Sequence, residues 1–223
     1  MEQNTTKYTE SWESLAQLFK AMNESLEYCV LRNTEDITSE FSPKIHGDID
    51  ILVSDQKAAV ELMHAAKVHQ KSYRVYYEVP VAGDVVPFDI RYVGDNYYCK
   101  LWEQDILASK VLTENGGVQF YIMSPEQQYY TLLYHVYLQK QSISADYPEK
   151  LSVYATYAGL EYRNDVEYVV AQLEVYMKEN QYIYEFPHDL AVGINWENVK
   201  ALCECWGGAV YVSSREIRMA GIE

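Results

Sequence analysis

The segment that most limits the possible folds of this chain is the stretch HGDIDILVSD, at residues 46–55. Successive side chains of a strand point to opposite faces of a sheet, so Asp48 and Asp50 point to the same side. The apolar residues between and after them point to the other side, into a core. A buried carboxylate without a partner is costly. A strand of this kind therefore needs a basic side chain or a metal ion beside its two aspartates.

A second apolar segment, Pro87-Phe88-Asp89-Ile90-Arg91, supplies a third carboxylate. Three carboxylates on neighbouring strands form an oxygen-rich site of the kind that Mg²⁺ or Mn²⁺ prefers. Two such ions can hold the attacking and leaving oxygens of a phosphoryl or nucleotidyl transfer. We therefore predict Asp48, Asp50 and Asp89 as metal ligands. An ionic alternative stays open, because Arg32 or Arg91 can neutralise these carboxylates instead.

The overall charge limits the possible partners. The formal net charge is −15, from 18 basic and 33 acidic residues. A surface of that sign repels phosphate backbones, so we do not expect nucleic acid as a partner. A small anionic nucleotide is not excluded, because bound divalent cations invert the local field.

The distribution of apolar residues predicts a cytoplasmic protein. The polar N-terminus, MEQNTTKYTE, lacks the apolar segment of a signal peptide. No apolar run approaches the roughly 18 residues that a membrane-spanning helix needs. The pattern leaves the oligomeric state open.

Hydrophobic periodicity and turn residues predict an α+β protein in which a mixed half precedes a mainly helical half. The border lies near Met123, which suggests domains at residues 1–123 and 124–223. Helices are expected near residues 9–26, 55–69, 102–112, 124–140, 148–160 and 165–178, and strands near 28–31, 48–53, 73–79, 85–93 and 119–122. Thr9 and Asp55 are the expected N-caps of the first two helices, and Ser124-Pro125 is the expected start of the fourth. Residues 82–84 are the expected turn of a β-hairpin between the strands near 73–79 and 85–93.

The order of these features resembles the nucleotidyltransferase superfamily, which has the polymerase-β-like fold. Its members carry an Asp-h-Asp-h strand, h being apolar, after a first helix and strand, and a third acidic residue on a later strand. The matching segments here are Gly47-Asp48-Ile49-Asp50-Ile51 and Phe88-Asp89-Ile90, the latter acid 39 residues after Asp50. The match covers about residues 10–93. The resemblance implies a catalytic domain with a mixed sheet and flanking helices, followed by a helical domain that contacts substrate or nucleotide.

The resemblance also implies roles for the three aspartates. Asp48 and Asp50 would hold the metals that bind the triphosphate. Asp89 would hold the second metal and help to deprotonate the acceptor. The implied enzyme is a transferase that uses Mg²⁺ or Mn²⁺ and moves a nucleoside monophosphate from a nucleoside triphosphate, ATP among them, to a hydroxyl of a small molecule or glycan.

One segment departs from the family pattern. Leu31-Arg32-Asn33 stands where members have a small-residue turn that holds phosphate. Arginine can bind a phosphate with two parallel hydrogen bonds, so we predict Arg32 and Asn33 as phosphate contacts. Alternatively, Arg32 only fixes the long loop after it.

The same segment is similar to the LicD-like branch and to proteins linked to surface-polysaccharide synthesis. That similarity implies a second function, transfer of a phosphodiester group onto a polysaccharide precursor. A third alternative is a non-catalytic regulatory module with the same fold.

The helical half adds candidates in the stretch YYTLLYHVYLQK, residues 129–140. Related enzymes contact the donor nucleotide through this second domain, so the resemblance implies a phosphate contact for Lys140 and a base contact for Tyr134. Packing in a core is the alternative for the tyrosines, which recur at helical spacing. It is also the alternative for His135, which lies among them.

Overall fold

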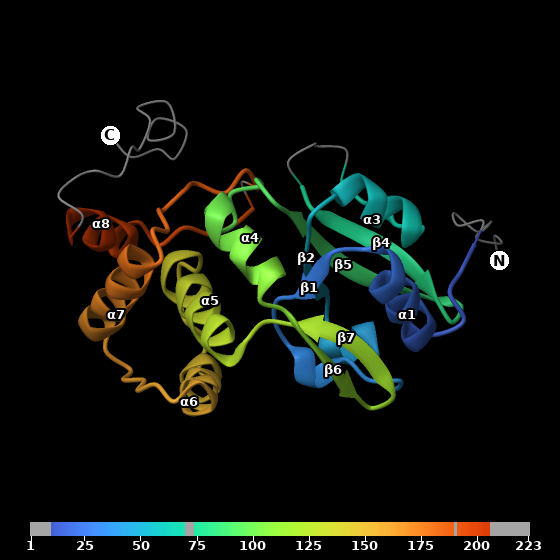
Figure 1. Ribbon diagram of the computed structural model, residues 1–223, viewed down its shortest axis with the longest axis horizontal. Coiled ribbons are helices and arrows are strands. Elements are labelled where there is room, and N and C mark those ends of the chain that lie inside the picture. The colour runs from blue at the N-terminus through green and yellow to red at the C-terminus, as the bar shows by residue number, and fades with distance from the viewer. Residues whose placement is uncertain (1–9, 70–73, 190, 206–223) are drawn as a thin grey trace.

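The computed structural model describes residues 10–69, 74–189 and 191–205. They form eight α-helices and a seven-stranded mixed sheet, in agreement with the predicted α+β class (Figure 1). The helices are α1 (Leu15–Ser25), α2 (Pro43–His46), α3 (Gln56–Leu62), α4 (Lys100–Ala108), α5 (Pro125–Leu138), α6 (Tyr147–Ala158), α7 (Val166–Glu179) and α8 (Trp196–Cys205), with a 3₁₀ turn at Thr34–Asp36. The strands are β1 (Tyr28–Val30), β2 (Ile49–Val53), β3 (Ala66–Lys67), β4 (Tyr76–Val81), β5 (Asp84–Tyr92), β6 (Val111–Asn115) and β7 (Val118–Ile122).

The order of the strands brings two distant parts of the chain together. The sheet runs β3-β4-β5-β2-β1-β7-β6. β2 pairs with β1 in antiparallel and with β5 in parallel orientation. In the parallel pair, Asp50 lies opposite Asp89. Side chains at paired positions of neighbouring strands point to the same face, so this register places the two carboxylates side by side.

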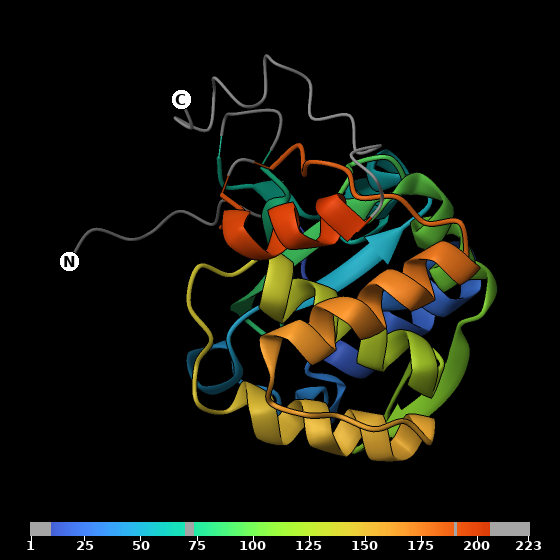
Figure 2. The same ribbon diagram turned by 90° about the vertical axis from the view of Figure 1, so that its left-hand side faces the viewer.

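The two faces of the sheet belong to different cores. α1 and α3 cover one face, where Phe19 and Met22 pack with Ile49 and Ile51. The opposite face meets α4 and the later helices, whose core surrounds Trp102. Figure 2 looks onto these helices, with the sheet behind them. α4 packs in the helical core although it precedes the expected border near Met123, so the second core includes residues from both predicted domains.

Several local signals are confirmed. Asp55 caps α3 by accepting a hydrogen bond from the Ala58 N–H, at 3.0 Å. Ser124 caps α5 by accepting one from the Gln127 N–H, at 3.3 Å, and Pro125 opens that helix. These side chains satisfy N–H groups that have no partner inside the helix.

The first helix begins later than predicted. The expected N-cap, Thr9, lies outside the described residues, and α1 begins only at Leu15, capped by Ser14. Trp12 instead forms a parallel β-bridge with Val81. The helical pattern that we extended over residues 9–26 therefore combined a helix with a bridged segment.

Other boundaries differ where strand pairing overrides helical periodicity. The helix expected at 55–69 ends at Leu62, because residues 66–67 pair with β4 as strand β3. The helix expected at 102–112 is α4, which ends at Ala108, and the residues from Val111 onward pair with β7 as β6. α8 was not predicted.

The turn between β6 and β7 carries a testable constraint at Gly116. A Cβ atom at this position would lie 2.7 Å from Cβ of Thr38, and Gly116 has a φ of +50°. Gly117 beside it has a φ of +82° but nothing within 4 Å of such a Cβ. We expect Gly116→Ala to reduce the free energy of unfolding by about 1–3 kcal/mol more than Gly117→Ala, because it adds overpacking to left-handed strain. Urea unfolding followed by circular dichroism measures the difference, and equal losses would contradict the close approach.

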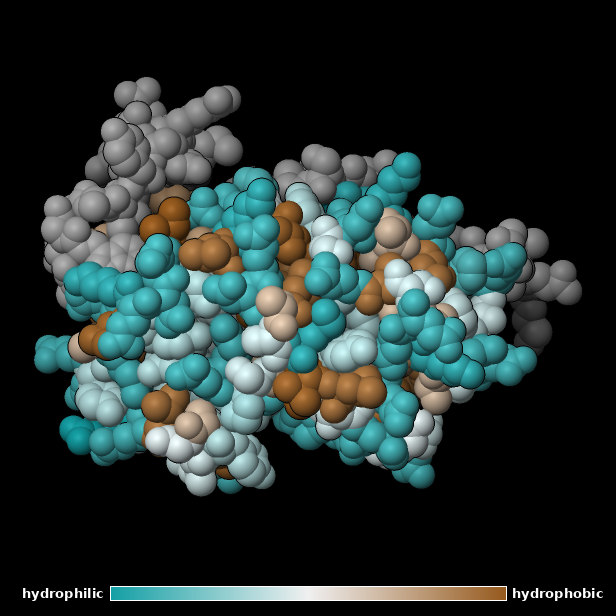
Figure 3. Space-filling model, in the orientation of Figure 1, coloured by the Kyte–Doolittle hydropathy of each residue, from teal (hydrophilic) through white to brown (hydrophobic). Residues whose placement is uncertain are grey.

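The surface offers no single large apolar face on the side shown in Figure 3, where hydrophilic residues dominate. Exposed apolar side chains lie on separate elements, for example Leu112 on β6, Tyr157 on α6 and Val175 on α7. None of the helices in the described part of the chain has both the length and the hydropathy to cross a bilayer.

Candidate functional site

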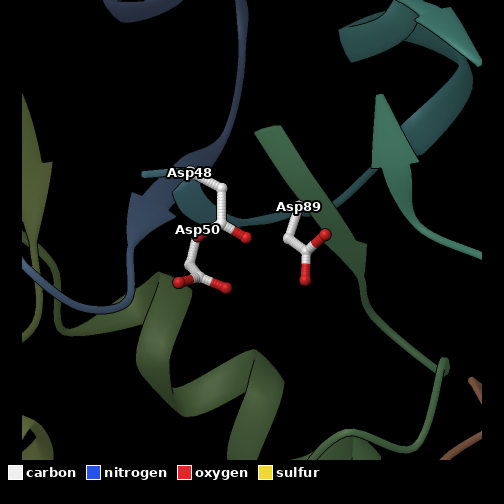
Figure 4. Close-up of side chains that lie close together, drawn as sticks. All are labelled: Asp48, Asp50 and Asp89. Atoms are coloured by element: carbon white, nitrogen blue, oxygen red, sulfur yellow. The ribbon is translucent and has the colours of Figure 1, made fainter. Parts of the chain in front are cut away.

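Three carboxylates converge at one end of the β2–β5 pair (Figure 4). Asp48 directly precedes β2, Asp50 lies on it and Asp89 lies on β5. One oxygen from each lies within 4.8 Å of the others. Carboxylate oxygens are the donors that Mg²⁺ and Mn²⁺ favour, and the spacing allows one ion to reach all three. The structure therefore brings together the three residues that we predicted as metal ligands.

Burial makes the negative charge of this cluster costly. Burial, followed by the charge of Asp50, raises the pKa of Asp89 to about 6, although Arg91 acts in the opposite direction. Burial, followed by the charge of Asp50, also raises the pKa of Asp48. Like charges close together oppose ionisation, whereas an added cation favours it. The cluster is thus electrostatically suited to a divalent cation.

Two arginines provide part of the counter-charge. Nε of Arg32 donates to Oδ2 of Asp50 at 3.1 Å, and its Nη2 pairs with Oδ1. Arg91 lies 3.5 Å from Oδ2 of Asp89 and is also within 4 Å of Asp95 and of Asp189. The ionic partners that we considered as an alternative to a metal are therefore present. Arg32 binds one carboxylate with its planar fork, whereas Arg91 is shared among three.

Tyr97 connects these arginines. The sequence did not indicate this role, because tyrosines in a loop carry no periodic pattern. Its hydroxyl accepts a hydrogen bond from Nη1 of Arg32 at 2.6 Å. The Arg91 guanidinium carbon lies 4.0 Å from the centre of its ring. The same hydroxyl lies 2.7 Å from Nδ1 of His135, and the Tyr97 carbonyl accepts from Nε2 of Gln139 at 2.6 Å. Tyr97 thereby joins the sheet to α5.

A cavity of about 1180 Å³ opens over the three carboxylates. Its other walls come from the end of α5 and from residues 186–189 and 191–194, which precede α8. Small-molecule sites typically occupy about 300–1,000 Å³, so this cavity is large enough for a small-molecule ligand. The lining also includes Phe186 and Trp196, whose ring centres lie 5.4 Å apart. No motif in the sequence pointed to these two aromatic residues.

The predicted phosphate contacts line the same cavity as the carboxylates. The ammonium of Lys140 lies over the Tyr147 ring, 5.5 Å from its centre, and forms no ion pair with any described carboxylate. Asn33 has a left-handed backbone, and its Oδ1 accepts from Nζ of Lys150 at 2.7 Å. Arg32 is engaged with Asp50, so of these three side chains Lys140 is the cation that is not neutralised.

Tyr134 is the exception among the predicted site residues. Its side chain is fully buried, and its ring packs edge-on against Trp102 and Tyr98. It is not among the residues that line the cavity. The packing role that we considered for the tyrosine stripe describes this residue, and the structure does not place it for the predicted base contact. His135, in contrast, is buried but reaches the cavity wall.

Neither a protein-family model nor a curated protein matches this chain. The function is therefore argued from the geometry and charge of the site.

Proposed function

We propose that this chain is a divalent-cation-dependent nucleotidyltransferase of the polymerase-β-like fold. It would transfer a nucleoside monophosphate from a nucleoside triphosphate to a hydroxyl of a small molecule or glycan, with release of pyrophosphate. The observation that carries the proposal is the convergence of Asp48, Asp50 and Asp89, held by strand register, on a cavity that also contains an unneutralised lysine.

The residues present fit a divalent cation. Three hard oxygen donors lie within reach of one ion, and burial favours a positive partner for them. Asp48, Asp50 and Asp89 would hold Mg²⁺ or Mn²⁺. When bound, such an ion polarises phosphoryl oxygens and lowers the pKa of a hydroxyl beside it. Of the three, Asp89 is the carboxylate that the family resemblance assigns to deprotonation of the acceptor.

The charge of the cavity supports an anionic substrate. Four cationic side chains line it, from Arg32, Arg74, Arg91 and Lys140, and four carboxylates oppose them, from Asp48, Asp50, Asp89 and Asp189. The lining is therefore neutral on a chain whose net charge is −15. Bound divalent cations would make it positive, which favours a triphosphate. Lys140 would contact a phosphate, since its ammonium has no described carboxylate partner.

A ligand screen tests the proposal. The melting temperature is measured with each of the four nucleoside triphosphates and with CDP-linked donors, in Mg²⁺ and in EDTA. We expect at least one triphosphate to raise it in Mg²⁺ but not in EDTA, because a ligand that binds only the folded state stabilises it. A rise of equal size in EDTA would contradict a cation-dependent site.

Product analysis separates the alternatives. Release of pyrophosphate supports nucleotidyl transfer, whereas release of a nucleoside monophosphate from a CDP-linked donor would indicate the phosphodiester-group transfer of the LicD-like branch. Failure to bind both Mg²⁺ and every nucleotide in calorimetry would favour a non-catalytic module.

A further inference from the structure

The central carboxylate of the cluster already has a cation beside it. Both oxygens of Asp50 are engaged by the fork of Arg32, through Nε at 3.1 Å and through Nη2. Only 13% of the Arg32 side chain and 6% of the Asp50 side chain are exposed. Two charges paired in this way, away from water, interact more strongly than a surface pair. A divalent cation at the site would need the same oxygens.

Arg32 is also held from its other side. Its Nη1 donates to the hydroxyl of Tyr97 at 2.6 Å. Burial and the nearby arginine lower the pKa of His135, so its ring is neutral and Nδ1 can accept the proton of that hydroxyl, 2.7 Å away. Tyr97 is itself fixed, because its N–H donates to Oδ1 of Asp95 and its carbonyl accepts from Gln139. The guanidinium would thus keep a partner in the cavity if it left Asp50.

We propose that Arg32 is the internal counter-cation of Asp50 and that it competes with a divalent cation for this carboxylate. The inference rests on the proposed function in one respect, the binding of a divalent cation by the three aspartates. It makes Arg32 a residue that weakens cation binding rather than one that supports it. Of the three aspartates, only Asp50 is held in this way, because Arg91 divides its charge among three carboxylates at 3.5–3.7 Å.

A purely structural role for Arg32 predicts the opposite sign. If the fork served only to orient Asp50, its loss would release the carboxylate from its position and weaken cation binding. If Arg32 competes, its loss leaves three carboxylates without their strongest internal cation and tightens cation binding. The direction of the change in affinity therefore distinguishes the two roles.

The test is titration of the full chain with Mn²⁺, followed by electron paramagnetic resonance of the free ion. It is done at pH 8, above the pKa of about 6 of Asp89, so that protons do not compete with Mn²⁺ at this carboxylate. We expect Arg32→Met to bind Mn²⁺ on the order of tenfold more tightly than the wild type, because charge-assisted bidentate pairs are among the stronger side-chain contacts. Arg32→Lys keeps the charge but not the fork, and we expect an intermediate affinity.

Arg163→Met is the matched control. Arg163 also holds a carboxylate with its fork, that of Glu161, but both side chains are more than half exposed and neither lines the cavity. The substitution removes the same charge and the same geometry elsewhere, so its Mn²⁺ affinity should equal that of the wild type. Far-UV circular dichroism confirms that each variant is folded.

The outcomes separate this inference from the proposed function. Tight binding by Arg32→Met with weak or absent binding by the wild type supports it. If the wild type binds Mn²⁺ and Arg32→Met binds it equally well or more weakly, the competition by Arg32 is overturned, whereas the proposed metal site is not. If Arg32→Met does not fold, the Mn²⁺ affinity of Arg32→Lys is compared with that of the wild type instead. Tighter binding supports the inference, and equal or weaker binding overturns it. Absence of binding in the wild type and in every folded variant contradicts both proposals.

Discussion

Asp89→Asn is expected to abolish the Mg²⁺-dependent rise in melting temperature that a nucleoside triphosphate causes. It is also expected to lower the rate of nucleotidyl transfer by about a hundredfold or more. The substitution keeps the shape of the side chain but removes one of three charges that lie within 4.8 Å of one another. An amide is a weaker ligand than a carboxylate for hard cations. Thermal shift with and without EDTA, together with pyrophosphate release, measures both effects.

The same variant should not be destabilised when no cation is added. The pKa of Asp89 is raised to about 6 in the folded chain, mainly by burial. A raised acid pKa means that stability present at low pH is lost as the pH rises through 6. At pH 8 ionised Asp89 therefore costs stability, and a neutral amide avoids that cost.

Asp84→Asn provides the control for position 89. Asp84 lies at the exposed start of the same strand, β5, and outside the cavity, so the substitution makes the same charge change away from the site. It should preserve the full ligand response. An Asp89→Asn variant that kept the wild-type response to Mg²⁺ would refute the assignment of the metal site.

Trp102→Ala is expected to reduce the free energy of unfolding by about 3–5 kcal/mol, the range for aromatic-to-alanine changes in a core. The Trp102 side chain is fully buried, stacks on Tyr182 with ring centres 4.8 Å apart and meets Tyr134 edge-on. Its Nε1 donates to Oε1 of Gln127 at 2.6 Å. The variant would lose these contacts and leave a buried amide oxygen without its donor.

Urea unfolding followed by far-UV circular dichroism measures the effect of Trp102→Ala. Leu101→Ala is the matched control, because Leu101 lies beside Trp102 on α4 but is 42% exposed. It should cost less than about 1 kcal/mol. A loss of similar size in both variants would contradict the central place of Trp102 in the helical core. The free energy of unfolding of a protein domain is only about 5–15 kcal/mol. The loss expected for Trp102→Ala is therefore a large fraction of the total stability.

The elements that sequence predicted well carry their signals locally. The caps at Asp55 and Ser124 and the β4–β5 hairpin with its turn at residues 82–83 depend on neighbouring residues, and all are present. The misplaced boundaries involve strands whose partners lie elsewhere in the chain. The segment at 111–115 has helical periodicity before it, but it pairs with β7. Local periodicity cannot reveal that pairing with a distant strand replaces the helix.

At the site, the pattern of residues along each strand is sufficient to predict which side chains share a face. Alternation along a strand places Asp48 and Asp50 opposite the apolar residues that fill the core, and it places Asp89 in a second strand of the same kind. This much follows from the period of two in an extended chain. It was enough to name the three carboxylates and to predict a divalent cation as their partner.

The neighbours of those carboxylates, in contrast, depend on how distant parts of the chain pack together. The parallel pairing of β2 with β5 places Asp89 against Asp50, the fork of Arg32 engages Asp50, and Tyr97 links that fork to α5. The tertiary structure also buries Tyr134 in the core and brings residues 186–189 and 191–194 to the cavity wall. The physical reason is that strand order and buried ion pairs arise from non-local contacts, whose free energy depends on the packing of the whole chain rather than on any local pattern.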